Sequence, residues 1–424
     1  MRDDTDHPLV TTTRAPSLFH VMSDRSVRRL ILAEFAFSAG VFLQAAVLGK
    51  QVYDITGREL DLGLLGLAEF LPAAVLVLVT GAVADRFDRR RVAAIGLFGE
   101  LLCSLGLLFY ARSEPTAVWP IFVISVLFGA SRSFIAPAAR ALPPMVAPDG
   151  ALPRVIALNS GTWTAAIIVG PAASGILYSI DAWVAYAVSA TLIAAGMVGV
   201  WGLPVRRWPT PPDPDERPSL HSALEGLRFI RRTPILLAAI SLDLFAVLFG
   251  GAIALLPAIA EDRLGVGDVA YGWLRAAAGI GAAAMAAWLA MRPITRHVGV
   301  KLMVAVAVFG VGTLVLGATT SYVIAFAAIV ALSAADMISV FIRSTLVPLV
   351  TPDEKRGRVL AVENVFIGAS NELGAFESGV VASAVGTPVA VVSGGVGTLI
   401  VAVIWIFRFP ALRRVDRFDD ITVE

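Results

Sequence analysis

Charged side chains interrupt the long apolar runs of this 424-residue chain, and they are its main candidates for chemistry. They are Glu34, Glu69, Glu100, Arg132, Asp243, Arg275, Asp336, Arg343, Glu372 and Glu377. A charge in hydrocarbon is costly, so each such residue is a candidate for substrate binding, ion passage or proton relay. A buried carboxyl beside an arginine can take up and release a proton, which is the chemistry that this pattern predicts.

Eight polar residues of the runs are our candidates for proton coupling or for a substrate cavity: Glu34, Glu69, Arg132, Asp243, Asp336, Arg343, Asn371 and Glu372. Asp336 and Glu372 fit proton carriage best by depth, followed by Glu34 and Glu69. The sequence also allows ion pairs between Glu34 and Arg132 and between Asp243 and Arg343. Static salt bridges that hold helices together are the alternative interpretation.

The elements that must position these residues are membrane-spanning helices. The chain is 57% hydrophobic and only 16% charged, against about 25% charged in soluble domains. Runs of about 20 apolar residues can cross a bilayer. Twelve are predicted, in two groups of six: 29–52, 60–84, 92–111, 117–140, 155–178, 182–203, 235–260, 267–291, 300–318, 322–347, 358–384 and 388–408. The expected fold class is therefore an all-α polytopic membrane protein.

The order of these runs predicts five parts: a polar tail at 1–28, a helical bundle at 29–203, a linker at 204–234, a second bundle at 235–408 and a tail at 409–424. A surface helix is expected near Ser17–Arg29. The linker starts with a stretch containing six prolines, which cannot continue a helix. Leu220, Leu224 and Leu227 then recur at helical spacing, which predicts an amphipathic helix on the membrane surface.

Lys and Arg are distributed unevenly between the two sets of loops. One set contains clusters such as Arg89–Arg91, whereas the other contains only Lys50, Arg58, Arg112 and Arg263. Positive charge gathers in cytoplasmic loops. We therefore expect both termini and the central linker to be cytoplasmic, in the inner (plasma) membrane.

An internal repeat supports two related halves. With a shift of 204 residues, Val146-x-Pro148-Asp149 falls on Val350-x-Pro352-Asp353, and Arg154-Val155 falls on Arg358-Val359. The same shift matches Ser174-Gly175 to Ser378-Gly379 without a gap. Matches of Pro, Asp, Arg and Gly at one constant shift indicate that a membrane unit was duplicated.

A short loop at 81–91 is the predicted gate, with Gly81, Asp85, Arg86, Arg89 and Arg90 as its residues. Asp85 could cap the positive end of a helix in the other half, and the arginines could pair with acids across the cleft. Contacts that exist in one conformation only would bias a two-state equilibrium. The alternative is a basic loop that only sets topology.

A second motif, Gly170-Pro171-Ala172-Ala173-Ser174-Gly175, predicts close helix packing and a bend. Gly170, Pro171 and Gly175 are its key residues, and ordinary small-residue packing is the alternative interpretation.

Soluble chemistry is not indicated. Cys103 is the single cysteine, and all four histidines fall outside the apolar runs. We find no phosphate-binding glycine loop, zinc spacing or Ser/His/Asp arrangement. We therefore expect no enzyme activity, no cofactor, no metal and no nucleic-acid partner.

The loop Asp85-Arg86-x-x-Arg89-Arg90 resembles the loop between helices 2 and 3 of the major facilitator superfamily. Further segments are similar to its drug and siderophore exporter branch, which includes the enterobactin exporter. They are Ser131-Arg132-Ser133-Phe134, Asp243-Leu244-Phe245 and Pro352-Asp353-Glu354-x-Arg356-Gly357-Arg358-Val359. In one departure, Glu34 stands where members of the branch often have a basic residue.

The resemblance implies a major facilitator fold of two pseudo-symmetric six-helix bundles. It also implies a monomeric, proton-driven exporter of small amphipathic molecules, in which the 81–91 loop latches the outward-facing state. The expected partners are the bilayer, protons and a small substrate. Nutrient uptake by the same fold and a non-transporting scaffold or sensor are the alternatives.

Overall fold

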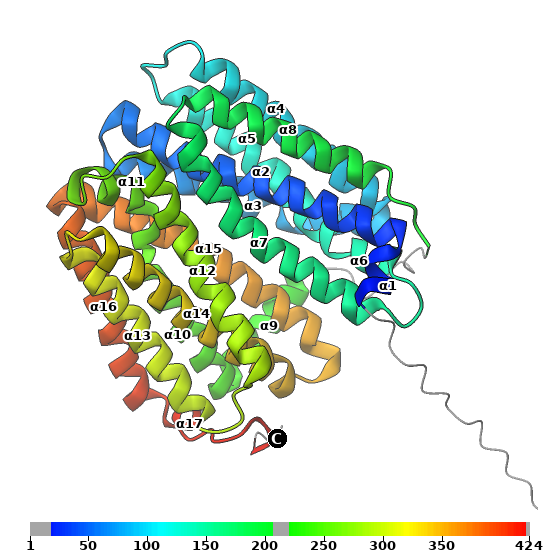
Figure 1. The fold of residues 1–424 in the computed structure, drawn as a ribbon. Helices are drawn as coiled ribbons and strands as arrows, with labels where there is room; N and C mark the ends of the chain where they lie inside the picture. The colour runs from blue at the N-terminus through cyan, green and yellow to red at the C-terminus, as the bar shows by residue number, and fades with distance from the viewer. Residues whose placement is uncertain (1–17, 207–219, 421–424) are drawn as a thin grey trace, which may run out of the picture.

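The computed structural model of the chain describes residues 18–206 and 220–420. The predicted tails at 1–28 and 409–424 and the Pro-rich part of the predicted linker therefore lie wholly or partly outside the described residues. The described part is built from helices that run across the molecule in two groups (Figure 1).

Six long helices form the first half. They are α2 (Arg25–Thr56), α3 (Glu59–Arg86), α4 (Arg89–Ala111), α5 (Trp119–Arg140), α7 (Leu152–Tyr178) and α8 (Ala182–Trp201). Two short helices accompany them, α1 (Leu18–Ser23) and α6 (Leu142–Val146). Each predicted span from 29–52 to 182–203 corresponds to one of the long helices.

Six long segments form the second half. The first is α10 (Pro234–Phe249), which continues through η2 (Gly251–Leu255), α11 (Leu256–Ala258) and η3 (Ile259–Arg263). The others are α12 (Asp268–Met291), α13 (Val298–Ala318), α14 (Tyr322–Val350), α15 (Asp353–Val385) and α16 (Thr387–Arg408). The short elements α9 (Leu220–Arg232), α17 (Pro410–Arg413) and η4 (Phe418–Asp420) flank them.

Ten of these helices in the described ranges are long and apolar enough to cross a membrane. The remaining two long helices are α3 and α15. They carry charged residues within their length, such as Glu69 in α3 and Glu372 in α15. Both pack against each other between the two halves, where such groups need not face lipid.

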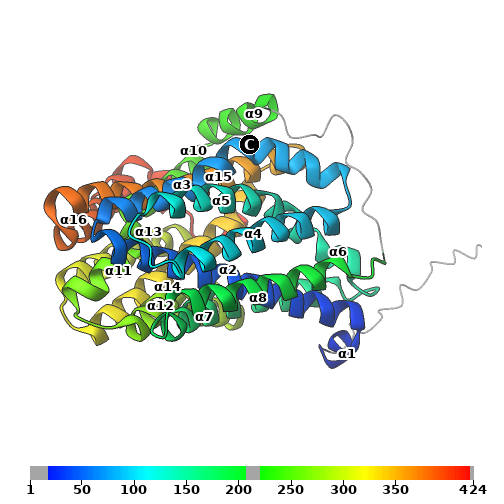
Figure 2. The same ribbon diagram turned by 90° about the horizontal axis from the view of Figure 1, so that it is seen from above.

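The two halves repeat one packing scheme. In the first half, α2 packs on α7 and α8, α4 on α5 and α8, and α3 on α5. In the second half, α10 packs on α15 and α16, α13 on α14 and α16, and α12 on α14. Between the halves, α7 packs on α12 and α15 packs on α3 (Figures 1 and 2). This correspondence agrees with the internal repeat in the sequence.

The first membrane helix begins earlier than expected, at Arg25 rather than residue 29. Asp24 is its N-cap, because its side chain accepts hydrogen bonds from the backbone N–H groups of Ser26 (2.9 Å) and Val27 (3.2 Å). The same helix ends at Thr56, where Gly57 adopts a left-handed φ of 58°. The surface helix expected near Ser17–Arg29 is therefore only the short α1 and the start of α2.

The predicted span 235–260 is not one regular helix. It turns into a 3₁₀ segment at Gly251, whose backbone lies against the backbone of Gly374 in α15. Pro257 follows and lacks the N–H that a regular helix needs at this point. Close backbone contact and the missing donor together account for the break.

The helix that the Leu220, Leu224 and Leu227 spacing predicts forms as α9. It lies at the edge of the molecule beside α10 and α15 (Figure 2). Glu225 of α9 pairs with Arg358 of α15, and Gly226 lies against the backbone of Arg358. These contacts fasten α9 to the second half.

Glycine pairs occupy both crossings between the halves. A Cβ on Gly175 of α7 would lie only 2.9 Å from Gly272 Cα of α12. A Cβ on Gly379 of α15 would lie 3.0 Å from Gly63 Cα of α3. Gly175 and Gly379 are the residues that the 204-residue repeat brings into register. The repeat therefore preserves a contact that only glycine permits.

Candidate functional site

A cavity of about 370 Å³ lies between the two halves. We call it the central cavity. Its charged and amide side chains are Glu69 from α3, Arg132 from α5, Arg275 from α12, Asp336 from α14, and Asn371 and Glu372 from α15. The structure thus brings five of the eight predicted coupling or cavity residues to one space, and adds Arg275.

A second cavity of about 580 Å³ lies within the first half. We call it the side cavity. Its polar and aromatic lining includes Glu34, Glu100, Arg132, Asn159 and Trp163. Arg132 and Phe42 line both cavities. The side cavity therefore lies next to the central cavity and shares its guanidinium group.

Arg132 is the main positive charge at this junction. Its side chain is exposed to the cavities, and no ion pair within 4.0 Å holds it among the described residues. Its charge acts on Glu69, Glu100 and Glu372. Arg275 acts on Glu69 and Glu372 as well, so three carboxyl groups share two guanidinium groups here.

The ion pair that we considered between Glu34 and Arg132 does not form in this conformation. Both residues line the side cavity, but Glu34 instead accepts a hydrogen bond from Ser38 in its own helix at 3.2 Å. The exposed Arg132 side chain reaches into cavity space rather than to Glu34.

The ion pair expected between Asp243 and Arg343 does form. Arg343 Nη2 lies 2.8 Å from Asp243 Oδ1, and both side chains are less than 10% exposed. Arg343 also lies 3.5 Å from Glu363 of α15, which the sequence reading missed. These three residues link α10, α14 and α15 inside the second half, so their geometry is that of a buried structural network.

Asp336 lies on the cavity side of that network. It lines the central cavity and, with Asp243, a small void between α10, α13 and α14. Glu372 faces the other half, since a Cβ on Gly66 would lie 2.9 Å from Glu372 Oε2. Asn371 donates to the backbone oxygen of Ile367 at 2.8 Å, so its amide is partly engaged within its own helix.

The predicted gate loop joins α3 to α4. Gly81 and Arg86 lie in the last turns of α3, and the side chain of Asp85 lies outside the described residues. Arg89 is the first residue of α4. Arg90 Nη1 donates to the backbone oxygen of Leu203 at 2.7 Å, which is a contact within the first half.

Asp88 organises this loop, although the sequence reading did not single it out. It caps α4 by accepting from the Arg90 backbone N–H at 3.0 Å, and it pairs with the Arg90 guanidinium at 2.8 Å. Burial alone would raise the pKa of Asp88. The hydrogen bonds from Arg90 and the charges of Arg90 and Arg91 outweigh that effect and hold the pKa below its usual value.

The Gly170 motif packs against α2 and α12. A Cβ on Gly170 would lie 2.8 Å from the backbone oxygen of Ala39. The backbone oxygen of Pro171 lies 2.8 Å from a Cβ built on Gly272. With the Gly175 crossing described above, all three residues lie where α7 approaches other helices.

A cluster of charges connects the two halves at the end of the molecule opposite the predicted gate loop. Lys50 Nζ of α2 contacts Asp54 in its own helix, Glu261 at 2.9 Å and Asp268 at 3.6 Å. We call these four residues the Lys50 cluster. Tyr53 also donates to Asp262. The sequence reading counted Lys50 only as a loop charge and missed its pairing with acidic residues of the second half.

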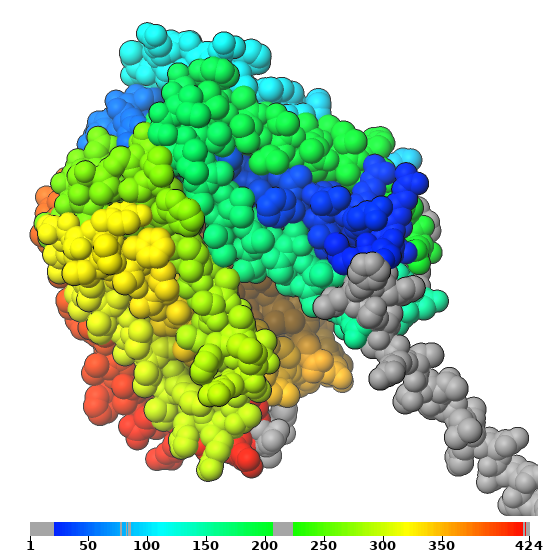
Figure 3. Space-filling model, viewed as in Figure 1, coloured from blue at the N-terminus to red at the C-terminus, as the bar shows by residue number. Residues whose placement is uncertain are grey.

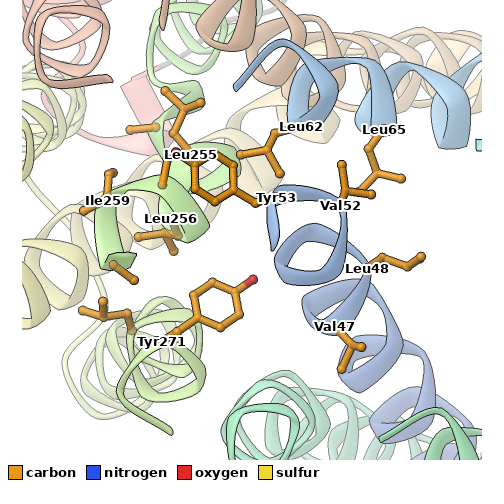
Figure 4. Packing of buried hydrophobic residues seen from close by; sticks show 14 of the residues in the cluster. Val47, Leu48, Val52, Tyr53, Leu62, Leu65, Leu255, Leu256, Ile259 and Tyr271 are labelled. Atoms are coloured by element: carbon orange, nitrogen blue, oxygen red, sulfur yellow. The ribbon is translucent and has the colours of Figure 1, made fainter. Parts of the chain in front are cut away.

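Apolar side chains seal the same end. Leu48 and Val52 of α2 pack with Leu255 and Leu256 of the second half, and all four are fully buried (Figure 4). Tyr271 of α12 points to α2 and donates to the Ala46 backbone oxygen at 2.9 Å (Figure 4). This end is therefore closed by hydrophobic packing as well as by charge.

The halves diverge at the other end of the molecule, which contains the loop between α3 and α4 with Arg86 and Arg89–Arg91. We call it the arginine-rich end. Figure 3 shows a furrow between the first half and α12, with residues of α15 recessed at its floor. The central cavity reaches the seal at the Lys50 end, since Gly49 of α2 is one of its lining residues. The molecule is thus closed at one end and open at the other.

The chain is similar in sequence to several transport proteins. The chain is 24% identical over 405 residues to the multidrug efflux pump Tap of Mycolicibacterium fortuitum, covering 91% of this chain and 96% of the relative. It is 24% identical over 392 residues to the enterobactin exporter EntS of Escherichia coli O1:K1 / APEC, covering 91% and 92%. It is also 26% identical over 309 residues to the MFS-type transporter YfiS of Bacillus subtilis, covering 70% of each chain.

Solved structures share the fold at low identity. A POT family transporter in complex with 5-aminolevulinic acid superposes with a TM-score of 0.71 at 12% identity, covering 92% of this chain and 96% of that one. A bacterial homologue of the lysosomal transporter Spinster, in an inward-facing conformation, gives 0.68 at 15% identity, covering 92% and 97%. Residues 17–423 match the family described as transmembrane secretion effectors. The chain therefore belongs to this family of the major facilitator superfamily.

Proposed function

We propose that the chain exports small amphipathic molecules in exchange for protons, by alternating access. The observation that carries this proposal is the central cavity, which collects ionisable side chains from both halves between a sealed end and an open end. Substrate sites of such transporters lie near mid-membrane, at the interface of the repeats. The efflux functions in the names of Tap and EntS support export over uptake.

We assign the arginine-rich end to the cytoplasm, because the positive-inside rule puts clustered Lys and Arg there. Both termini and the linker between the halves are then cytoplasmic, in the plasma membrane. In this orientation the conformation described here is inward-open. The protein works as a monomer, since each chain supplies both halves of the cavity.

Asp336 and Glu372 are the proposed proton carriers, with Glu69 and Glu34 as further members of the set. Asp336 borders the Arg343 network, and Glu372 faces Gly66 of the other half. Rocking of the halves changes the surroundings of Glu372 most directly, because its contact crosses the interface. A carboxyl whose surroundings alternate can take up a proton on one side and release it on the other.

Two gates then alternate. The Lys50 cluster and the apolar seal close the outer end in the inward-open state. Gly81, Asp85, Arg86, Arg89 and Arg90 latch the inner end in the outward-open state, where Asp85 meets a helix of the second half. The Arg90 contacts within the first half are then the resting arrangement of that latch.

Transport of ethidium into inverted vesicles under an imposed pH gradient tests this function. We expect gradient-dependent accumulation with the unaltered protein and its loss in Asp336→Asn or Glu372→Gln. Glu377→Gln is the matched control, because Glu377 is another carboxyl of α15 that does not line the central cavity. Accumulation that does not depend on the gradient would contradict proton coupling, and flux in the reverse direction would favour uptake.

A further inference from the structure

The side cavity contains hydrogen-bond acceptors that lack donors. Both carboxylate oxygens of Glu100 and the amide oxygen of Asn159 are buried without a hydrogen-bond partner. Glu100 itself is 0% exposed. Buried polar atoms are nearly always paired, so unpaired acceptors in a cavity wall indicate a missing donor.

The missing group is best supplied by a cation. A carboxylate without a partner is strongly disfavoured in an apolar interior unless a proton or a counter-charge accompanies it. Arg132 lines the same cavity, but its charge is shared with Glu69 and Glu372. Glu34 adds another carboxyl to the cavity wall, and Arg140, in the last turn of α5, adds a second guanidinium to it.

The remaining wall is suited to an organic ring. Phe42 and Trp163 meet edge to face, with ring centroids 5.8 Å apart, and Phe37, Val41 and Ile135 complete the apolar lining. Aromatic faces attract cations as well as apolar groups. The volume of about 580 Å³ falls within the range of roughly 300–1,000 Å³ that is typical of sites for drug-sized ligands.

We propose that the side cavity binds a lipophilic amine, with Glu100 as the counter-charge of its ammonium group and Asn159 as an additional acceptor. The aromatic pair holds the apolar part of the ligand. As a statement about substrate class, this inference rests on the proposed function. It selects protonated amines among the amphipathic molecules that such an exporter could carry.

A binding measurement on the purified full chain in lipid nanodiscs tests the site without any transport step. The probe is dansylcadaverine, which combines an apolar fluorescent ring with a primary ammonium group. Its N-acetyl derivative keeps the ring and chain but removes the charge. We expect the amine to bind at least about tenfold more tightly than the N-acetyl derivative, as expected for a charge-assisted hydrogen bond. Equal affinities would overturn the proposal.

Variants localise the binding. Glu100→Gln keeps the shape of the side chain and should weaken amine binding by about tenfold or more, with little effect on the neutral derivative. Glu377→Gln, outside the cavity, should leave both affinities unchanged. If Glu100→Gln fails to fold, Asn159→Leu and Glu34→Gln replace it, and each should weaken amine binding selectively. Unchanged amine affinity in the folded variants would overturn the site.

Binding and transport can fail separately. Amine binding without gradient-driven flux would leave the site in place and contradict the exporter function. Ethidium flux without selective amine binding would support the exporter and overturn the side-cavity assignment.

Discussion

Lys50 Nζ lies 2.9 Å from Glu261 Oε2, and this contact joins α2 of the first half to η3 of the second half. The Lys50 side chain is only 10% exposed, while that of Glu261 is 51% exposed. The ammonium group of Lys50 is therefore held within the protein, whereas the carboxylate of Glu261 is accessible to water. Such a pair can form and break as the two halves rock.

We expect Lys50→Met to shift the population toward the state that is open at this end. Loss of the charge-assisted contacts should cost about 1–2 kcal/mol, reduced from the buried value because Glu261 is half exposed. Spin labels on Ile180→Cys and Val323→Cys, both exposed positions at this end, would report the change by pulsed electron resonance. In Lys50→Met, the distribution of distances between the two labels should contain a larger fraction of the longer distance than in the unaltered protein.

Arg58→Met is the matched control for Lys50→Met. Arg58 lies at the same end, but its side chain is 65% exposed and it pairs at 3.7 Å with Asp61 of its own half. It should leave the distance distribution unchanged. The gate assignment fails if both variants behave alike.

The glycine crossing predicts a second effect. Gly175→Ala adds a Cβ that meets the α12 backbone, so α7 and α12 must move apart. Overpacking of this kind costs about 1–3 kcal/mol and should lower both the thermal midpoint in detergent and the rate of ethidium flux. Gly161→Ala in the same helix meets nothing within 4 Å and should be neutral or slightly stabilising. Equal behaviour of the two variants would argue against a tight crossing.

Removal of Arg343 should destabilise the second half. Arg343→Met leaves Asp243 buried without its counter-charge, which costs about 3–5 kcal/mol. Arg343→Met combined with Asp243→Asn should recover much of that loss. Arg296→Met is the control, because its pair with Asp416 is mostly exposed. Thermal unfolding of the purified variants measures the differences, and a neutral single variant would contradict the structural role.

Acid should weaken the loop between α3 and α4 through Asp88. Because the pKa of Asp88 is lower in the folded protein, its contribution is present above the unfolded pKa and is lost as the pH falls through the folded pKa. Asp88→Asn can still cap the helix but lacks the charge, so it should be less stable at neutral pH by about 0.5–1 kcal/mol. The difference should vanish in acid, and a difference independent of pH would exclude the charge as its cause.

The fold was largely predictable from the sequence, because each apolar run long enough to cross a membrane predicts one helix. Both α3 and α15 were predicted although each carries a charged residue within its length, since apolar runs remained around Glu69 and Glu372. The break after Phe249 was missed. It depends on the contact of Gly251 with Gly374, residues far apart in sequence whose approach no local pattern reports.

The site was predictable in part. Charge in a hydrophobic context marked Glu69, Arg132, Asp336 and Glu372, and the structure gathers these around one cavity. The Lys50 cluster and the pairing of Glu363 with Arg343 depend on how helices of different halves or distant segments face one another. Spacing along one helix carries no information about that arrangement.

The glycine pairs at the two crossings have a consequence for the speed of the proposed alternating-access cycle. Larger side chains at a contact that opens and closes would lose rotamer freedom at every closure, at up to about 2 kcal/mol each. Gly63, Gly175, Gly272 and Gly379 have no rotamers to lose. The two halves can therefore meet and separate at these points with little entropic cost from side chains, which favours rapid exchange between the two states.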